Sequence, residues 1–429
     1  MERLGASANR KLKQTWPDTE HLLVPELGYF GTKLVYCSTS GTKGNEMDAG
    51  HREPRNWTSD DGRRSAEIDV YIPASLSGQH IASASPAAEA AAERDVQSLK
   101  GEMPLRPLGP ILLRSEGIAS SRIEGEVAST RRVFEAEYAP DDVSDRQAQR
   151  IVNSIHVMSD VIAGAGESVT PKAFNRWHAL LFEGVPVTFE PGVVRTRQNW
   201  IGTRTDTPVG ADFIPPPPES VEEALRDLAG FTNRVDVAPL TQAAIAHAQF
   251  ETIHPYPDGN GRIGRALVYR SWAYRGVAAE ITPPISRILV ENRQAYVDGL
   301  TAYRDGDVDK WLLFFFDVVQ SAVSYTRSLA ARLETLASEW LEGLAGTHED
   351  ALARRLVTQL PARPVLSAAD VAERHQVTER GARAALDDLV DRGILTFRTL
   401  RQAKRGRPAK VYEATELFSL LDLTPQDLA

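Results

Sequence analysis

Cysteine is nearly absent from this sequence, and long apolar runs are absent as well. The 429 residues include one cysteine, Cys37, which excludes an internal disulfide and is typical of a reducing compartment. The most apolar run, residues 311–319, is too short to span a bilayer and is interrupted by Asp317. Residues 1–14 are polar and basic, so we expect no signal peptide. These absences predict a cytoplasmic protein without a membrane-bound part.

The chain also lacks an excess of basic residues. Its 49 Lys and Arg against 58 Asp and Glu give a formal net charge of −9 at pH 7. That balance argues against a protein that coats nucleic acid along its whole surface, although it is compatible with a local basic patch. With 42% hydrophobic and 25% charged residues, the composition is that of ordinary globular domains. The length suffices for two or three of them.

One stretch, residues 254–265 (HPYPDGNGRIGR), concentrates residue types that bind phosphate. Gly259 and Gly261 flank Asn260 and let the backbone turn tightly, which brings its N–H groups close to a ligand. Because a helix is expected from Ile263 onward, these N–H groups lie at a helix N-terminus. Unpaired donors and the helix dipole both favour an anion there. The stretch therefore predicts a binding loop for the phosphates of a nucleotide.

The charged side chains of this loop suit three different tasks. Arg262 and Arg265 are three residues apart and project from the same side of the helix, and their forked guanidiniums match phosphate oxygens. Asp258 is a hard oxygen ligand beside them, suited to a Mg²⁺ ion held mostly by water and phosphate. His254 precedes the turn and titrates near neutrality, as a base for a hydroxyl nucleophile must.

The same run resembles the signature of the Fic (filamentation induced by cAMP) family, His-Pro-Phe-x-(Asp/Glu)-Gly-Asn-Gly-Arg-x-x-Arg, with Tyr256 in place of Phe. The resemblance implies transfer of AMP from ATP to a protein hydroxyl, with His254 as general base and Asp258 holding Mg²⁺. Doc-type members, which have Lys at the position of Gly261, phosphorylate instead, so Gly261 favours AMP transfer. The residues implied to bind the phosphates are Gly259, Asn260, Gly261, Arg262 and Arg265.

Three other interpretations of the loop are weaker. An ordinary Gly- and Asn-rich turn needs none of the charged residues at these spacings. A metalloprotease would need the His-Glu-x-x-His spacing, and His247 and His254 are seven residues apart. A Walker loop would need Gly-Lys-Ser/Thr after the glycines, and this sequence continues differently.

A second motif lies in a helix expected over residues 111–127. Ser120 and Glu124 are four residues apart and would share a helix face, which by itself is a common surface pair. Together with the Fic signature, Ser120, Glu124 and Gly125 resemble the family's inhibitory motif, (Ser/Thr)-x-x-x-Glu-(Gly/Asn). That resemblance implies that Glu124 pairs with Arg265 in cis and withholds the guanidinium that should bind the γ-phosphate. The alternative is plain helix packing.

Composition divides the chain up to residue 345 into an extension, an arm and a core. Residues 1–66 are rich in Gly, Ser, Thr, Asn and Asp, which predicts a poorly ordered extension. Residues 67–106 form an N-terminal arm with an Ala-rich helix. Residues 107–345 form a nearly all-helical core. Within it, residues 195–202 resemble the family's flap, a small β-hairpin that aligns the target by strand pairing, although an ordinary surface hairpin has the same pattern.

Residues 346–429 show a different order of elements. Ser367 and Thr378 each cap a helix, and two strands follow, joined by a basic turn. This order is similar to that of a winged helix-turn-helix domain. The similarity implies DNA contacts, but aspartates on the second helix and the docking role of other winged helices leave a non-DNA role open. The candidate DNA-contacting residues are Arg380, Arg383, Lys404, Arg405 and Arg407.

The predicted fold class is mainly α: a Fic-type helical core with a small β-hairpin flap, plus a C-terminal winged helix-turn-helix domain. The expected function is that of a protein adenylyltransferase, which moves AMP from ATP with Mg²⁺ to a Ser, Thr or Tyr of a target protein, itself included. One alternative is a DNA-binding regulator whose Fic core senses a nucleotide. Another is a Fic enzyme that removes AMP or transfers a different nucleotide. A homodimer stays open, because some family members control their inhibitory helix by dimerisation.

Overall fold

The computed structural model describes residues 47–59, 61–101, 108–138, 145–278, 282–401 and 408–422. All of them belong to one unit of the chain, Gly44–Ala429. Most of the predicted extension, and the predicted wing residues Lys404, Arg405 and Arg407, lie outside the described residues.

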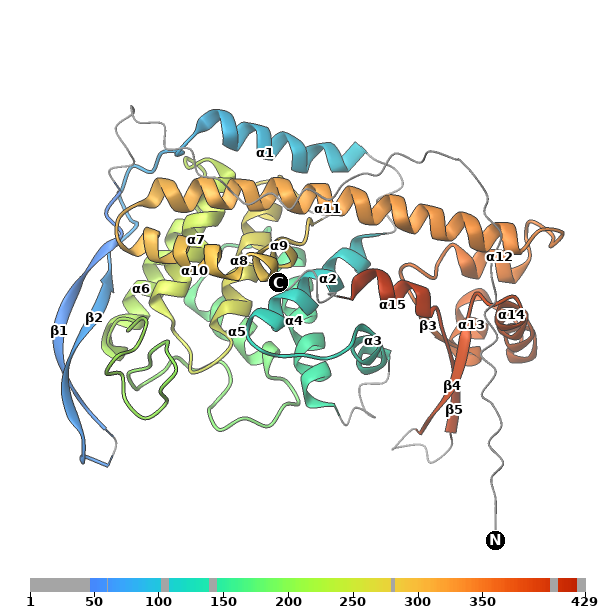
Figure 1. The fold of residues 1–429 in the computed structure, drawn as a ribbon, viewed down its shortest axis with the longest axis horizontal. Helices are drawn as coiled ribbons and strands as arrows, with labels where there is room; N and C mark the ends of the chain where they lie inside the picture. The colour runs from blue at the N-terminus through green and yellow to red at the C-terminus, as the bar shows by residue number, and fades with distance from the viewer. Residues whose placement is uncertain are drawn as a thin grey trace, which may run out of the picture. The chain divides into compact units, whose positions relative to one another are not determined.

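Two consecutive helices, α7 (Pro239–Ile253) and α8 (Asn260–Tyr274), form the centre of the described chain (Figure 1). α7 begins with a proline, whose missing N–H is no loss in the first turn, and it is buried on all sides. A helix so enclosed must be apolar around its circumference or pair its polar groups. Gln242 meets that condition by donating to the carbonyl of Phe231 at 2.9 Å. Because both helices are buried, the loop between them, residues 254–259, begins and ends in the core.

The remaining helices of the core surround this pair. α4 begins where the side chain of Asp145 accepts hydrogen bonds from two N–H groups of its first turn. The long helix α11 contains Phe314, Phe315 and Phe316, which are all buried, as predicted for a helix covered on more than one side. The bounds are α1 Pro86–Ser98, η1 Leu99–Gly101, α2 Gly109–Ile123, α3 Thr130–Tyr138, α4 Arg146–Ala163, α5 Pro171–Leu181, α6 Pro218–Thr232, α9 Ile285–Glu291, α10 Arg293–Arg304 and α11 Val308–Gly343.

An antiparallel hairpin precedes these helices, formed by β1 (Gly50–Thr58) and β2 (Ser65–Pro73). The predicted boundary at residue 66 cuts through it, so the extension is shorter than we expected from the sequence. The reason is physical: most side chains of β1 are exposed and polar, which hides the alternation by which a strand is recognised. β2 joins the hairpin to the core, because Tyr71 donates its N–H to Ile214 at 2.9 Å.

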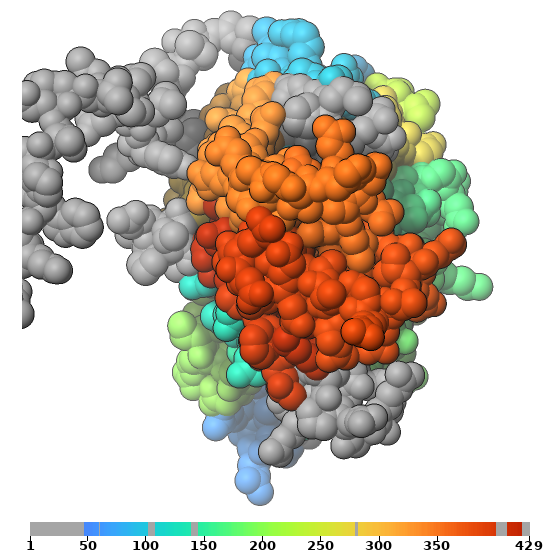
Figure 2. Space-filling view, turned by 90° about the vertical axis from the view of Figure 1, so that its right-hand side faces the viewer, coloured from blue at the N-terminus to red at the C-terminus, as the bar shows by residue number. Residues whose placement is uncertain are grey.

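The C-terminal region combines helices with a small antiparallel sheet of strand order β3-β5-β4. The side chains of Ser367 and Thr378 cap α13 and α14, as predicted. α12, β3 and the last helix were not predicted. In Figure 2 this region, orange to red, covers the face turned to the viewer. Its elements are α12 Leu352–Val357, β3 Val365–Ser367, α13 Ala368–His375, α14 Glu379–Asp391, β4 Thr396–Arg401, β5 Pro408–Glu413 and α15 Thr415–Leu421.

This C-terminal region contacts α3. The rings of Phe134 and Phe418 lie 5.2 Å apart, and Tyr138 donates its hydroxyl hydrogen to Asp370 at 2.6 Å. Across the part of the chain that the structure describes, no helix combines the length and the apolar character needed to cross a bilayer.

Candidate active site

His254 ends α7 in the left-handed conformation, with φ of 47°. Only a few per cent of non-glycine residues adopt positive φ, and the surrounding structure must hold them there. Two contacts do so: the N–H of His254 donates to Phe250 at 2.9 Å, and its carbonyl accepts from Nε of Arg195 at 2.9 Å. Arg195 begins the predicted flap, and no side chain of that segment was assigned a role from the sequence.

The imidazole of His254 is neutral at physiological pH. Burial, and then the neighbouring charge of Arg195, lower the pKa of His254 from 6.5 to about 4. Its Nδ1 atom has no hydrogen-bond partner among the described residues. A neutral imidazole at this position is able to accept a proton from a hydroxyl group.

The turn after His254 is shaped by the side chain of Asn260. Its Oδ1 accepts from the N–H of Tyr256 at 2.9 Å, and its Nδ2 donates to the carbonyl of Tyr256 at 2.7 Å. Gly259 has φ of 81°, and a Cβ there would collide with Leu181. Both polar atoms of the Asn260 side chain are therefore engaged within the loop.

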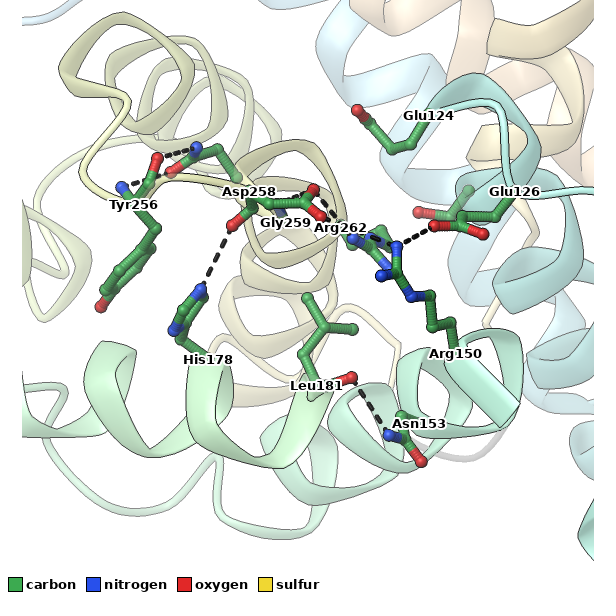
Figure 3. A network of polar contacts seen from close by, with 12 residues as sticks. Glu124, Glu126, Arg150, Asn153, His178, Leu181, Tyr256, Asp258, Gly259 and Arg262 are labelled. Carbon is green, nitrogen blue, oxygen red and sulfur yellow. Dashed lines mark hydrogen bonds and ion pairs between the residues drawn. The ribbon is translucent and has the colours of Figure 1, made fainter. Parts of the chain in front are cut away.

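His178 of α5 contacts the loop at Tyr256 and Asp258. This residue was not predicted from the sequence. Its ring stacks on Tyr256 with centroids 4.0 Å apart (Figure 3). Because Gly192 donates to Nδ1 of His178 at 2.7 Å, the ring proton sits on Nε2 and is donated to the carbonyl of Asp258 at 3.2 Å. Burial lowers the pKa of His178 to about 4, so this arrangement persists at neutral pH.

Arg262 provides a buried cation with unused donors. Its side chain is 1% exposed and donates from Nη2 to Oδ1 of Asp258 at 3.2 Å. Its Nε and Nη1 atoms have no hydrogen-bond partner among the described residues. Leaving buried donors unpaired is costly, whereas phosphate oxygens would satisfy them with charge-assisted bonds. The site therefore fits an anion at this position.

Arg265, in contrast, is bound by the end of α2 through its Nε and Nη2 atoms. Its Nε donates to Oγ of Ser120 at 2.9 Å, and its Nη2 donates to the carbonyl of Ser120 and to Oε1 of Glu124, each at 2.8 Å. α2 ends at Ile123, so Glu124 is its C-cap. The helix expected over residues 111–127 is therefore shorter at its end, and Glu124 lies one residue beyond it. Gly125, with φ of 84°, turns the chain away.

The carboxylate of Glu124 lies against the first turn of α8. A Cβ on Gly261 would collide with this carboxylate, so only glycine leaves room for it. Burial raises the pKa of Glu124, but the charge of Arg265 more than offsets this and leaves the pKa below its ordinary 4.5. At neutral pH an ionised carboxylate thus occupies the place where helix N–H groups favour an anion.

Asp258 is the one carboxylate of the loop itself. Its side chain is 41% exposed and accepts from the N–H of Gly259 at 2.6 Å. No group of three or more His, Cys, Asp or Glu among the described residues could hold a metal ion. A single accessible carboxylate suits Mg²⁺ that keeps its waters and binds phosphate, and does not suit a metal site made by protein alone.

The predicted flap is irregular. Within described residues 195–202 there is no regular strand, and one isolated bridge joins Ile201 to Phe213. The expected β-hairpin is therefore reduced to this bridge, in which Ile201 donates at 2.8 Å and accepts at 3.1 Å. Trp200 instead packs on Trp57 of β1, with ring centroids 6.0 Å apart. An open cleft of about 960 Å³ lies between this segment and the β1–β2 hairpin.

Part of the chain is similar to a known protein family. Residues 168–270, from before α5 to the middle of α8, match the sequence model of the Fic/DOC family. This part of the chain is therefore similar to the Fic/DOC family. The signature loop lies wholly within the matched residues, whereas α2 and the C-terminal region lie outside them.

Three curated relatives of this chain are named protein adenylyltransferases, the first of them as a probable one. The chain is 32% identical over 100 residues to a probable protein adenylyltransferase of Aquifex aeolicus, covering 23% of this chain and 29% of that protein. It is 26% identical over 246 residues to the protein adenylyltransferase Fic of Culex quinquefasciatus, covering 54% and 46%. It is 33% identical over 122 residues to a protein adenylyltransferase of Caenorhabditis elegans, covering 28% and 21%. The matched parts are less than half the length of each relative.

A solved structure of a Fic family protein from Desulfovibrio desulfuricans aligns with 77% of this chain and 96% of that chain, at 19% identity and a TM-score of 0.49.

Proposed function

We propose that this protein transfers AMP from ATP to the hydroxyl group of a Ser, Thr or Tyr side chain in a target protein, and that Glu124 holds the resting protein inactive. One observation carries the proposal: a neutral His254 lies beside a loop in which Arg262 has free donors and Arg265 is bound by a carboxylate. The names of the relatives support the same reaction class.

In the proposed reaction each of these groups has one task. The target oxygen forms a bond to the α-phosphorus, the bond from that phosphorus to the pyrophosphate oxygen breaks, and the hydroxyl proton moves to the imidazole of His254. Arg262 would bind the α- and β-phosphates, and Arg265 the γ-phosphate. The backbone N–H group of Gly261, and that of Gly259 once it leaves Oδ1 of Asp258, would bind the remaining oxygens. Mg²⁺, held by Asp258 and the phosphates, would neutralise part of the phosphate charge.

Inhibition follows from competition for Arg265. Glu124 and a γ-phosphate are both anions that need the same guanidinium, and the carboxylate is already in place. ATP that binds without Arg265 would be displaced from the line of attack, and a displacement of 1 Å costs about 10²-fold in rate. The intact protein should therefore be nearly inactive until Glu124 leaves.

Labelled ATP tests the reaction type. The Glu124→Gly variant is incubated with cell extract and Mg²⁺, using ATP labelled at the α- or at the γ-phosphate. AMP transfer puts the α-label and no γ-label onto protein, whereas phosphorylation would reverse this result. An enzyme that removes AMP would incorporate neither label and would release AMP from a protein already modified.

DNA contact is a second candidate function, supported by the exposed Arg380 and Arg383 in the first half of α14. Thr378 begins that helix, and a three-stranded sheet accompanies it. This arrangement has the element order of a winged helix-turn-helix domain. Arg383 is also paired with Glu379 at 3.0 Å, and DNA phosphates would have to compete with this contact.

A further inference from the structure

Arg150 of α4 reaches the same loop from outside the signature. Its Nη1 atom is paired with Oε1 of Glu126 and lies 3.8 Å from Oδ2 of Asp258 (Figure 3). The two oxygens of Asp258 therefore face two different guanidiniums, since Oδ1 accepts from Arg262. Arg150 and Arg262 also pack on one ring, that of Phe182, with guanidinium carbons 5.9 and 5.3 Å from its centroid. The two arginines thus share one anchor and one acidic neighbour.

The partners of these arginines come from one short segment. Glu124 binds Arg265, and Glu126, two residues later, binds Arg150. The segment that follows α2 therefore neutralises two cations of the loop at the same time. When that segment leaves, Arg150 and Arg265 both lose their carboxylates and face the anion site together.

We propose that Arg150 is a third phosphate-binding arginine, which takes the pyrophosphate part of ATP and which Glu126 occupies in the resting protein. The inference rests on the proposed function, because it assigns a ligand to the same site. Asp258 is the proposed ligand of the metal ion that binds the pyrophosphate, so an arginine beside its second oxygen faces the same phosphates. Three guanidiniums and a metal ion would then balance the charge of the triphosphate.

A purely structural role for Arg150 is the competing explanation. In that case Arg150 only ties Glu126 to Asp258, and breaking this contact from either end has the same effect. A ligand-binding role predicts opposite effects: removing Arg150 removes a phosphate contact, whereas removing the charge of Glu126 releases Arg150 for phosphate. The direction of the two effects therefore separates the explanations.

The test measures dissociation constants for ATP and for AMP by calorimetry, in the full-length Glu124→Gly protein with Mg²⁺. Adding Arg150→Ala should raise the constant for ATP by about tenfold to a hundredfold, the range of a lost charged hydrogen bond. The constant for AMP, which has no pyrophosphate, should change less than about twofold. Adding Glu126→Gln in place of Arg150→Ala should lower the constant for ATP. Arg150→Lys keeps the charge and the aliphatic stem, so its dissociation constant for ATP should lie between those of the Glu124→Gly protein and of the Arg150→Ala variant. It replaces Arg150→Ala in the test if the alanine variant does not fold.

Arg146 provides the matched control, because it is exposed on α4, one turn before Arg150. Arg146→Ala removes the same charge from the same helix and should leave both constants unchanged. If Arg150→Ala and Glu126→Gln shift ATP binding in the same direction, or if AMP binding falls as much as ATP binding, the assignment of Arg150 is wrong. If the Glu124→Gly protein itself binds no ATP, the proposed function fails and this inference fails with it.

Discussion

At the scale of single residues, the conformation of His254 is held by contacts from two other segments. Arg195 binds its carbonyl, and His178 fixes the carbonyl of Asp258 four residues later. These supports hold the loop before any ligand arrives. A base that is already in position needs no reorganisation when the substrate binds, which is the condition for efficient proton transfer.

Replacing His254 with alanine should lower AMP transfer by about 10²- to 10⁴-fold, the usual contribution of a general base. Initial rates with α-labelled ATP are measured for the Glu124→Gly protein and for the same protein that also carries His254→Ala. Normal transfer without the imidazole would remove His254 from the mechanism.

The depressed pKa of His254 gives a pH dependence with a defined sign. Because this pKa is about 4 in the folded protein and 6.5 ordinarily, the folded protein binds fewer protons than the unfolded chain between these values. The free energy of unfolding should fall as the pH drops through this window, while the base form persists. The titration of His254 should therefore cause no change in the rate of AMP transfer by the Glu124→Gly protein between about pH 6 and 8. A decline centred near 6.5 would contradict the burial of the ring.

Tyr256 differs from the usual Phe of the signature by one hydroxyl, and this hydroxyl donates to Asn175 at 2.8 Å. Tyr256→Phe should lower the free energy of unfolding by about 1 kcal/mol, because the hydrogen bond is lost and Asn175 keeps an unpaired acceptor. Denaturant unfolding of both proteins measures this difference. An unchanged midpoint would show that water replaces the hydroxyl without cost.

At the scale of elements, the site is assembled where α2, α4, α5 and α8 meet. α2 fits closely against α4 because Gly117 leaves room for Ile155. The close approach places the end of α2 over the start of α8, where Glu124 meets Arg265. The contact between Glu124 and Arg265, which we propose to be inhibitory, therefore depends on the position of the whole helix α2.

Gly117→Ala should displace α2 from α4, since the added Cβ collides with the side chain of Ile155. We expect a lower midpoint of thermal unfolding together with a higher rate of AMP transfer, smaller than the increase caused by Glu124→Gly. Gly166→Ala is the control, because nothing lies within 4 Å of a Cβ at that glycine. A folded Gly117→Ala protein with unchanged activity would show that inhibition does not depend on the packing of α2 against α4.

The sequence predicted elements with strong local signals and missed contacts between distant segments. The loop that we propose to bind phosphate is a run of neighbouring residues, and the caps at Ser367 and Thr378 are local too. His178 lies 80 residues from the Asp258 carbonyl that it binds. Nothing in the helical pattern around it distinguishes it from a packed core residue. Arg150 was hidden for the same reason, because its partners come from other elements.

At the scale of the whole molecule, Arg380 and Arg383 are exposed in the first half of α14, and Asp387, Asp388 and Asp391 lie further along the same helix. Asp387 accepts from Lys410 at 2.6 Å and from the hydroxyl of Tyr412 at 2.9 Å, so this carboxylate is already neutralised by the sheet. The acidic half of α14 is therefore a weaker argument against DNA than the sequence suggested.

If this region binds DNA, the logarithm of the binding constant should fall linearly with the logarithm of salt concentration. Arg380→Ala should reduce the slope by about 0.9 when the contact is to a phosphate. Binding should be lost when residues after 364 are removed. A salt-independent interaction, or one that survives this truncation, would assign the contact to another part of the chain.

We propose above all that Glu124 withholds Arg265 from ATP in a protein whose base is His254. The most direct measurement is the intact mass of three proteins after incubation with ATP and Mg²⁺: wild type, Glu124→Gly, and Glu124→Gly combined with His254→Ala. We predict an added AMP on the Glu124→Gly protein alone. Equal modification of the wild type would contradict the inhibitory role of Glu124, and modification of the double variant would contradict the role of His254.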